Sequence, residues 1–303
     1  MKKPQIALFI GILLISIFPV LVKIALTSAM VSAFYRMAIP AAILLPYMLI
    51  TKKLKFPSTR LMLRAAGCGI MFASDLALWN VSIQMSSATQ ATLLTNLAPI
   101  WVGIIAFLFL PTKPRPAFWL GTAIATIGVV IFIGMDVITS LSFDTAFILG
   151  TLSGVFYAVY ILLSKEVLEK AEVLPFVTVS FTSSAVFIGL INLFIGEPFV
   201  GFAFDAWTVL IIQGVFCQLI AWMLISYATK QMRATRVSLA LLAQGVFAAI
   251  IAWAFIGEYL SIANVIGGIL ILVGIAVTFH EPNTKLGKMK YEISKEKEGL
   301  GRP

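Results

Sequence analysis

Three ionisable residues lie inside long apolar stretches of the kind that cross membranes, where a charge is costly and becomes a candidate for function. They are Lys23, Arg36 and Asp75. At a rise of 1.5 Å per helical residue, each falls about 5 to 10 Å from the centre of its stretch, toward the same side. Two cations and one acid leave a surplus positive charge, which favours binding of an anion such as a substrate carboxylate. The structural alternative pairs Asp75 with Arg36, while Lys23 extends its amine to the interface.

Residue types for common catalytic or metal sites are scarce. His280 is the only histidine, so neither a catalytic histidine pair nor a metal site with two histidines can form. Both cysteines, Cys68 and Cys217, lie in apolar stretches and indicate neither a disulfide framework nor a zinc site. The sequence contains no GxxxxGK[ST] motif, so ATP does not drive the protein directly. We therefore expect no metal, no cofactor and no catalytic residue.

Polar and aromatic side chains recur at helical spacing on several apolar stretches. Ser153, Tyr157, Tyr160 and Ser164, for example, follow the i, i+4, i+7, i+11 pattern of one helix face. Such residues facing inward from several helices would line a hydrated cavity, although any one of them could simply bond between helices. Together with the charges, the candidate substrate-path residues are Lys23, Arg36, Asp75, Trp79, Asn80, Thr92, Asn96, Tyr157, Tyr160, Gln218, Trp222 and Gln244.

The composition identifies the environment of these residues. The chain has 303 residues, of which 60% are apolar and 12% charged, against about 45–50% and about 25% in soluble domains. A compact soluble fold cannot bury that much apolar surface. A soluble enzyme, a nucleic-acid binder and a disordered chain are therefore excluded, and the partners we expect are the lipid bilayer and a small-molecule substrate.

A membrane-spanning helix needs about 20 mostly apolar residues. The alternating segments of about ten residues that build a transmembrane β-barrel are absent from the sequence. We predict an all-α polytopic membrane protein with ten transmembrane helices. The expected spans are 5–26, 30–50, 61–83, 89–110, 117–135, 146–164, 174–194, 207–228, 236–257 and 262–280.

The distribution of charge between the spans predicts the topology. With the N-terminus inside, 20 of the 22 lysines and arginines fall on the inner side, and the other two are Lys23 and Arg36. Such a bias predicts that both termini lie on the cytoplasmic side of a bacterial-type inner membrane. Residues 165–172, rich in Lys and Glu, are expected to form a solvated inner loop.

A shift of 146 residues aligns the two halves of the chain. It places Gly121 on Gly267 and Gly128 on Gly274, among other matches. Five spans separate the copies, so the halves have opposite orientations, as in transporters with a site between two inverted repeats. We expect two inverted five-helix repeats, residues 1–140 and 141–280, followed by a polar cytoplasmic tail, 281–303.

The residues of both copies also carry a family resemblance. The stretches that carry it are 77–83, 87–89, 96–101, 225–228 and 234–235, with Arg36, Gly121, Gly128, Gly150, Gly257, Glu258, Gly267 and Gly274. The chain resembles the EamA-type transporters of the drug/metabolite transporter superfamily over residues 5–280. It departs from the family where Pro111-Thr112 replaces the usual Gly-Glu of the first copy, so any role of that glutamate applies only to Glu258.

The resemblance implies a ten-helix secondary transporter, often an exporter of amino acids or other small metabolites. An intramembrane enzyme or a lipid-handling protein is the alternative, but it would need a convergent set of acid, base or nucleophile. A channel would need repeated filter residues or charged rings, which the sequence lacks. Protons could couple through Asp75 alone, yet nearby cations favour its ionised form. Uncoupled or exchange transport stays equally open, as do monomeric and homodimeric states.

Overall fold

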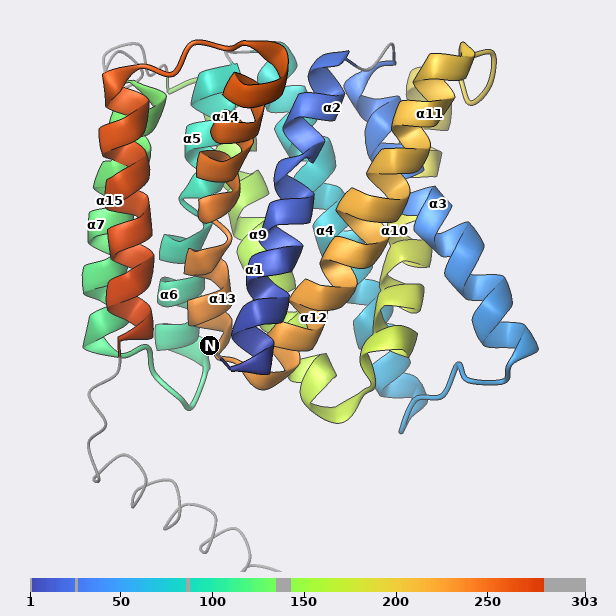
Figure 1. The fold of residues 1–303 in the computed structure, drawn as a ribbon. Helices are drawn as coiled ribbons and strands as arrows, with labels where there is room; N and C mark the ends of the chain where they lie inside the picture. Colours follow the sequence, from blue (N-terminus) through green and yellow to red (C-terminus); the bar gives the residue numbers. More distant parts are fainter. Residues whose placement is uncertain (1, 25–26, 86–87, 135–142, 281–303) are drawn as a thin grey trace, which may run out of the picture.

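The computed structural model describes residues 2–24, 27–85, 88–134 and 143–280, without the side chains of residues 22–24, 88 and 89. Over these ranges the protein is helical, and ten segments are long and apolar enough to cross a membrane. The helices stand side by side along a common direction (Figure 1). The face that holds the start of the first helix and the end of the last is termed the terminal face, at the bottom of Figure 1.

The ten spans follow the predicted order. The first half contains α1 (Lys3–Ser16) and α2 (Phe18–Ile24), α3 (Ala29–Ile50), α4 (Thr59–Met85), α5 (Ala88–Asn96) and α6 (Ala98–Phe109), and α7 (Pro116–Ile133). The second half contains α9 (Thr145–Lys170), α10 (Val173–Ile195), α11 (Phe204–Ile212) with the π-helix η1 (Gln213–Ile220) and α12 (Ala221–Gln231), α13 (Ala234–Ala240) and α14 (Ala243–Ile256), and α15 (Ile262–Phe279).

One predicted boundary is wrong. The segment expected to be a solvated loop after residue 164 continues as helix α9 to Lys170. Lys165 and Glu169 are one helical turn apart and form an ion pair of 3.2 Å, which supports the helix as i,i+4 pairs do. The apolar pattern marks only the part of a helix that lies in the hydrocarbon region. The prediction was therefore too short, because α9 continues beyond that region.

The fourth and ninth spans are broken at equivalent places. α5 ends at Asn96 and α6 begins at Ala98, with Pro99 in its first turn. Proline has no N–H to continue the helical hydrogen-bond ladder. α13 ends at Ala240 and α14 begins at Ala243, and the shift of 146 residues carries the first break to within two residues of the second. Interrupted helices of this kind line internal sites in transporters.

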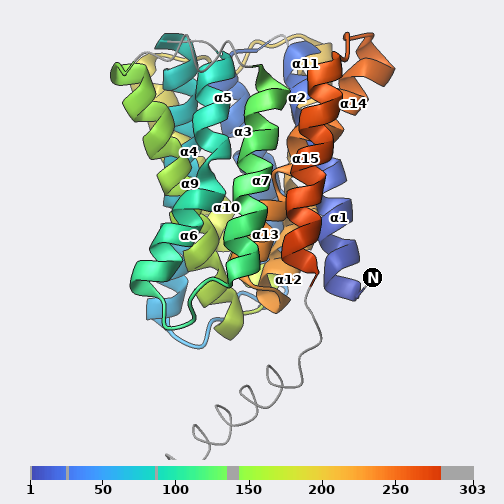
Figure 2. The ribbon, with the colours of Figure 1, turned by 90° about the vertical axis from the view of Figure 1, so that its left-hand side faces the viewer.

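The last spans of the two halves, α7 and α15, lie side by side (Figures 1 and 2). A Cβ added to Gly121 would lie 2.5 Å from the carbonyl oxygen of Gly274, and one added to Gly128 would lie 2.8 Å from that of Gly267. A two-fold axis that exchanges Gly121 with Gly267 and Gly128 with Gly274 interchanges these two contacts. The predicted fold of two inverted five-helix repeats is therefore confirmed.

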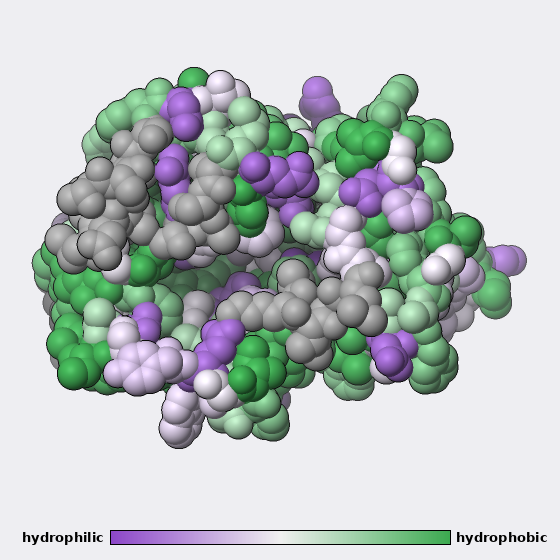
Figure 3. Space-filling view, turned by 90° about the horizontal axis from the view of Figure 1, so that it is seen from above, coloured by the Kyte–Doolittle hydropathy of each residue, from purple (hydrophilic) through white to green (hydrophobic). Residues whose placement is uncertain are grey.

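Ion pairs join several helices at the terminal face. Arg64 of α4 pairs with Glu166 of α9, and Lys230 of α12 pairs with Glu172 at 3.0 Å, beside the start of α10. Lys165 also donates to the carbonyl of Lys230 at 2.9 Å. These contacts link both halves of the chain at the terminal face, while the opposite face carries a recess near its centre, bordered by hydrophilic residues (Figure 3).

Candidate functional site

Two parallel polar contacts connect α3 to the π-helix η1 in the interior of the bundle. Ser32 donates to Oε1 of Gln213 at 2.7 Å, and Nε of Arg36 donates to Oε1 of Gln218 at 2.6 Å. The guanidinium of Arg36 also lies 4.1 Å from the centre of the Phe18 ring, so its charge receives a cation–π contact. Arg36 is 5% exposed, and the contacts fix the orientation of a buried cation.

The π-helix explains why both glutamines reach α3. Ser32 and Arg36 are four residues apart and therefore lie one above the other on an α-helix. Gln213 and Gln218 are five residues apart, a spacing that would place them on different faces of an α-helix. In a π-helix the hydrogen bonds run from i to i+5, so residues five apart lie about one turn apart. The unusual helix brings both amides to one side, and such segments are frequent at functional sites.

Asp75 of α4 lies at the end of a short chain of hydroxyl groups. The hydroxyl of Ser153 in α9 donates to Oδ1 of Asp75 at 2.5 Å. Oγ of Ser153 also lies 3.0 Å from the hydroxyl oxygen of Thr95 in α5, within hydrogen-bond distance. Asp75 is 5% exposed, so a buried acid is stabilised by a neutral donor, with its second carboxyl oxygen not engaged by any described residue.

Four aromatic rings from three helices form a continuous cluster beside these charges. The ring of Phe72 lies 4.7 Å from that of Tyr160 and 4.7 Å from that of Trp222. Tyr157 stacks on the cluster, 6.3 Å from Tyr160. The cluster joins α4, α9 and α12 and therefore spans both halves of the chain. It provides an apolar wall one turn from Asp75.

Apart from the second carboxyl oxygen of Asp75, three unused hydrogen-bonding atoms in this region are donors. Among the described residues, Nε2 of Gln213, Nε2 of Gln218 and Nε1 of Trp222 are buried without a hydrogen-bond partner. Buried polar groups in native proteins nearly always have partners, so a group of three such donors on neighbouring turns requires an explanation. Arg36 adds further N–H groups, since only its Nε has a partner among the described contacts. An acceptor-rich ligand would satisfy all of them.

The expected direct pair between Asp75 and Arg36 is not present among the described side chains. Arg36 bonds to Gln218 and Asp75 to Ser153. The two charges are near enough to interact electrostatically. The side chain of Lys23 lies outside the described residues. Each charge is thus held by a neutral partner, because an amide or hydroxyl can be packed without stranding a second charge.

The remaining predicted site residues occupy several environments. Asn80 donates to the carbonyl of Leu76 in its own helix at 2.8 Å. Among the described residues, no hydrogen bond or ring contact joins the other predicted residues to the charged pair or the aromatic cluster. These are Trp79 of α4, Thr92 and Asn96 of α5, and Gln244 of α14, all partly buried.

Some residues of the site were not among the predicted ones. Helical spacing places Ser153 on the face of Tyr157 and Phe72 on the face of Asp75, although neither was among the candidate substrate-path residues. Phe18, Thr95 and Gln213 gave no such signal, because an aromatic, a threonine and a glutamine are ordinary in packed helices. No group of three or more His, Cys, Asp or Glu that could hold a metal occurs within the described residues.

Comparison with known proteins identifies the family. The model of the EamA-like transporter family matches residues 2–134 and 144–280. The chain belongs to the EamA-like transporter family. It is 25% identical over 220 residues to the uncharacterized transporter YdfC of Bacillus subtilis, covering 72% of this chain and 71% of that protein. It is also 25% identical over 217 residues to an uncharacterized transporter of Archaeoglobus fulgidus, covering 71% and 76%.

A solved crystal structure shares the fold of this EamA-like protein. The TM-score is 0.74 and the identity 18%, over 91% of this chain and 96% of the other. At that identity the likeness concerns the fold alone. The family and the relatives indicate a membrane transporter and not an enzyme.

Proposed function

We propose that this EamA-like protein exports amino acids or related carboxylate-bearing metabolites, by alternating access around a cavity between its two repeats. The observation that carries the proposal is the group of unpartnered donors on η1 and α12, next to the buried guanidinium of Arg36. A carboxylate offers up to four acceptor sites and binds guanidinium groups strongly. A carboxylate ligand therefore matches what Gln218, Trp222 and Arg36 leave unused.

The other groups of the site fit the rest of an amino acid. The second carboxyl oxygen of Asp75 can accept from a substrate ammonium group. The rings of Phe72, Tyr157, Tyr160 and Trp222 offer apolar area for a side chain. Opposite charges at the two ends of the ligand would then be matched by Arg36 and Asp75, which explains why these two residues are not paired with each other.

The energy source follows from the same residues. The absence of a nucleotide-binding motif from the sequence leaves secondary or exchange transport. Asp75, with the hydroxyls of Ser153 and Thr95, is the candidate carrier for protons if transport is coupled. Exchange without protons needs only that the substrate-loaded site alternates between the two faces of the membrane.

The charge bias supports the orientation. We infer cytoplasmic termini in a bacterial-type inner membrane, so the terminal face is cytoplasmic and the recess of Figure 3 is external. The repeats are taken as 1–140 and 141–280, with 281–303 as a cytoplasmic tail outside the described residues. A monomer contains the whole site, and a homodimer is equally compatible with it.

The test is counterflow in proteoliposomes that contain the purified protein. With unlabelled leucine or phenylalanine inside, labelled leucine or phenylalanine added outside should accumulate transiently and be recovered unchanged. The corresponding amines, which lack the carboxylate, should fail to exchange. Arg36→Gln should lower the initial rate at least about tenfold, as expected for loss of a charged hydrogen bond, whereas Lys3→Gln at the exposed start of α1 should not.

Three results would contradict the proposal. Equal exchange of amino acids and their amines would show that the protein does not recognise the carboxylate. Chemical conversion of the labelled compound would favour an intramembrane enzyme, and lack of exchange by any amino acid together with movement of labelled phospholipid would favour a lipid-handling protein.

A second prediction concerns the aromatic wall. In a variant with Cys68 and Cys217 replaced by alanine, Tyr157→Cys, Tyr160→Cys and Trp222→Cys should react with a water-soluble thiol reagent, because alternating access wets the cavity. Exported substrate should slow the reaction. Leu120→Cys is the control, since residue 120 is 57% exposed on α7, and an exposed leucine of a membrane-spanning helix is expected to face lipid. If all three cysteines are as inert as the control, the rings are packed core.

A further inference from the structure

A second polar site lies at the terminal face, away from the substrate residues. The start of α4 and the end of α9 enclose an open pocket of about 290 Å³. Its lining includes Arg60, Arg64 and Lys170, with Ser58 and Leu61 between them. The pocket contains three cations in a small volume, and like charges gathered in this way repel each other unless an anion is bound.

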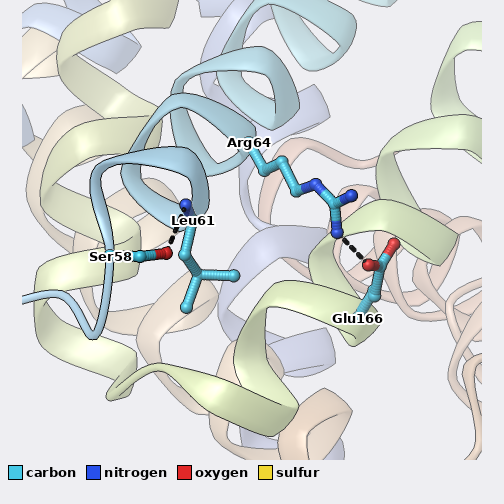
Figure 4. A network of polar contacts seen from close by, with 4 residues as sticks. All are labelled: Ser58, Leu61, Arg64 and Glu166. Atoms are coloured by element: carbon cyan, nitrogen blue, oxygen red, sulfur yellow. Dashed lines mark hydrogen bonds and ion pairs between the residues drawn. The ribbon is translucent and has the colours of Figure 1, made fainter.

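The partners of these cations leave most of the positive charge available. Arg64 pairs with Glu166 of α9, as Figure 4 shows. Among the described residues, Arg60 and Lys170 have neither an ion pair nor a hydrogen-bond partner, and both are exposed at the pocket. One carboxylate against three cations leaves about two unbalanced positive charges in the pocket.

The N-terminal end of α4 adds to the attraction for an anion. Ser58 precedes the first residue of α4, and its Oγ accepts from the N–H of Leu61 at 3.2 Å (Figure 4). That hydroxyl can still donate, because a serine side chain has a donor as well as acceptors. The pocket therefore lies at the positive end of a 27-residue helix, where an anion is favoured.

The position indicates the chemistry of the ligand. α4 and α9 are long and apolar enough to cross the membrane, and the pocket lies where both helices reach the terminal face. We infer that this places it at the depth of lipid headgroups. Basic pockets between transmembrane helices on the cytoplasmic side bind phosphate-bearing headgroups. We propose that Arg60, Arg64, Lys170 and Ser58 form a binding site for a phosphate-bearing anion at the terminal face. The proposal rests on the membrane fold and not on the proposed substrate.

The contact between the halves gives this site a consequence. α4 belongs to the first repeat and α9 to the second, so an anion held by Arg60 and Lys170 bridges the two repeats. Glu166 competes with that anion for Arg64, because both are acceptors for the same guanidinium. Binding should therefore stabilise the arrangement in which the terminal ends of α4 and α9 are close.

The experiment measures the unfolding midpoint of the full-length protein in a neutral detergent during titration with one of three additives. These are dioleoylphosphatidylglycerol, dioleoylphosphatidylcholine and inorganic phosphate, at constant ionic strength. A ligand of the folded state raises the midpoint. We expect phosphatidylglycerol to raise it and phosphatidylcholine not to. In Arg60→Gln/Lys170→Gln the half-maximal concentration should rise roughly tenfold to thirtyfold.

The matched control is Lys52→Gln/Lys55→Gln, which removes the same charge from the adjacent exposed loop without touching the pocket. It should keep the parental response. Glu166→Gln should lower the half-maximal concentration, since it frees Arg64. A response to inorganic phosphate alone identifies a soluble phosphate as the source of the anion. Two results overturn the site: no response to phosphatidylglycerol or inorganic phosphate, or an equal rise of the half-maximal concentration in both double variants.

Discussion

Asp75→Asn should lower the initial transport rate at least about tenfold, the effect expected when a charged hydrogen bond to the substrate becomes neutral. The amount of folded protein should change much less. Asparagine has nearly the same shape, and its Oδ1 can still accept from Ser153, which lies 2.5 Å from the carboxylate. What it loses is the negative charge that would bind a substrate ammonium group or carry a proton. Counterflow rates normalised to reconstituted protein measure the effect.

Asp205→Asn is the matched control, because Asp205 is an exposed acid in the first turn of α11. It should transport like the parent. The double variant Arg36→Gln/Asp75→Asn separates a structural role from a role in transport. The two side chains form no direct ion pair, but their charges interact electrostatically. Removing both leaves neither charge buried without the opposite charge, so protein levels should be at least those of the single variants. Parental transport in Asp75→Asn would show that this acid is not part of the site.

Gly267→Ala should strongly destabilise the bundle. The added Cβ would lie 2.4 Å from the backbone nitrogen of Phe132 and 2.6 Å from the carbonyl oxygen of Gly128. Backbone atoms cannot rotate away, so α7 and α15 must separate. Overpacking typically costs 1–3 kcal/mol, which corresponds to a melting temperature lower by about 3 to 10 °C. Thermal unfolding of the purified protein in detergent, followed by circular dichroism, gives the value.

Gly245→Ala makes the same chemical change on α14, where a Cβ would meet no atom within 4 Å. Its melting temperature should stay the same or rise slightly, because alanine favours the helix. Equal melting temperatures for the two variants would mean that the glycine contacts between α7 and α15 can relax at little cost.

The ten spans and the glycine repeat could be predicted from the sequence for physical reasons, whereas the contact between α7 and α15 was not predicted. Hydrocarbon thickness fixes the length of an apolar run, so ten runs give ten helices without knowledge of packing. Gly121, Gly128, Gly267 and Gly274 occur at one spacing in both halves, and close helix approach needs small residues. Once these two spans touch, inverted symmetry maps one crossed glycine contact of the structure onto the other.

The candidate site was only partly predictable. Helical spacing grouped Tyr157 with Tyr160, and the structure brings Trp222 to the same cluster. The partner of Arg36 could not be predicted, because Gln218 faces it only through the π-helix. The stretch Gln213–Ile220 contains ordinary helix-forming residues, and no local signal distinguishes hydrogen bonds to i+5 from bonds to i+4. That choice depends on the neighbouring helices, which are distant in sequence.

The π-helix also sets the angular phase of the eighth span. Each residue turns an α-helix by about 100°, so one additional residue rotates all that follows by about that angle. Gln213, Gln218 and Trp222 thus lie on one side of the span, the two glutamines against α3 and Trp222, four residues after Gln218, against Phe72 and Tyr160. In a straight α-helix these contacts would be out of register. The eighth span therefore consists of two segments at a fixed rotation to each other. The π-helix η1 holds Arg36 through Gln218, and α12 contributes Trp222 to the aromatic cluster.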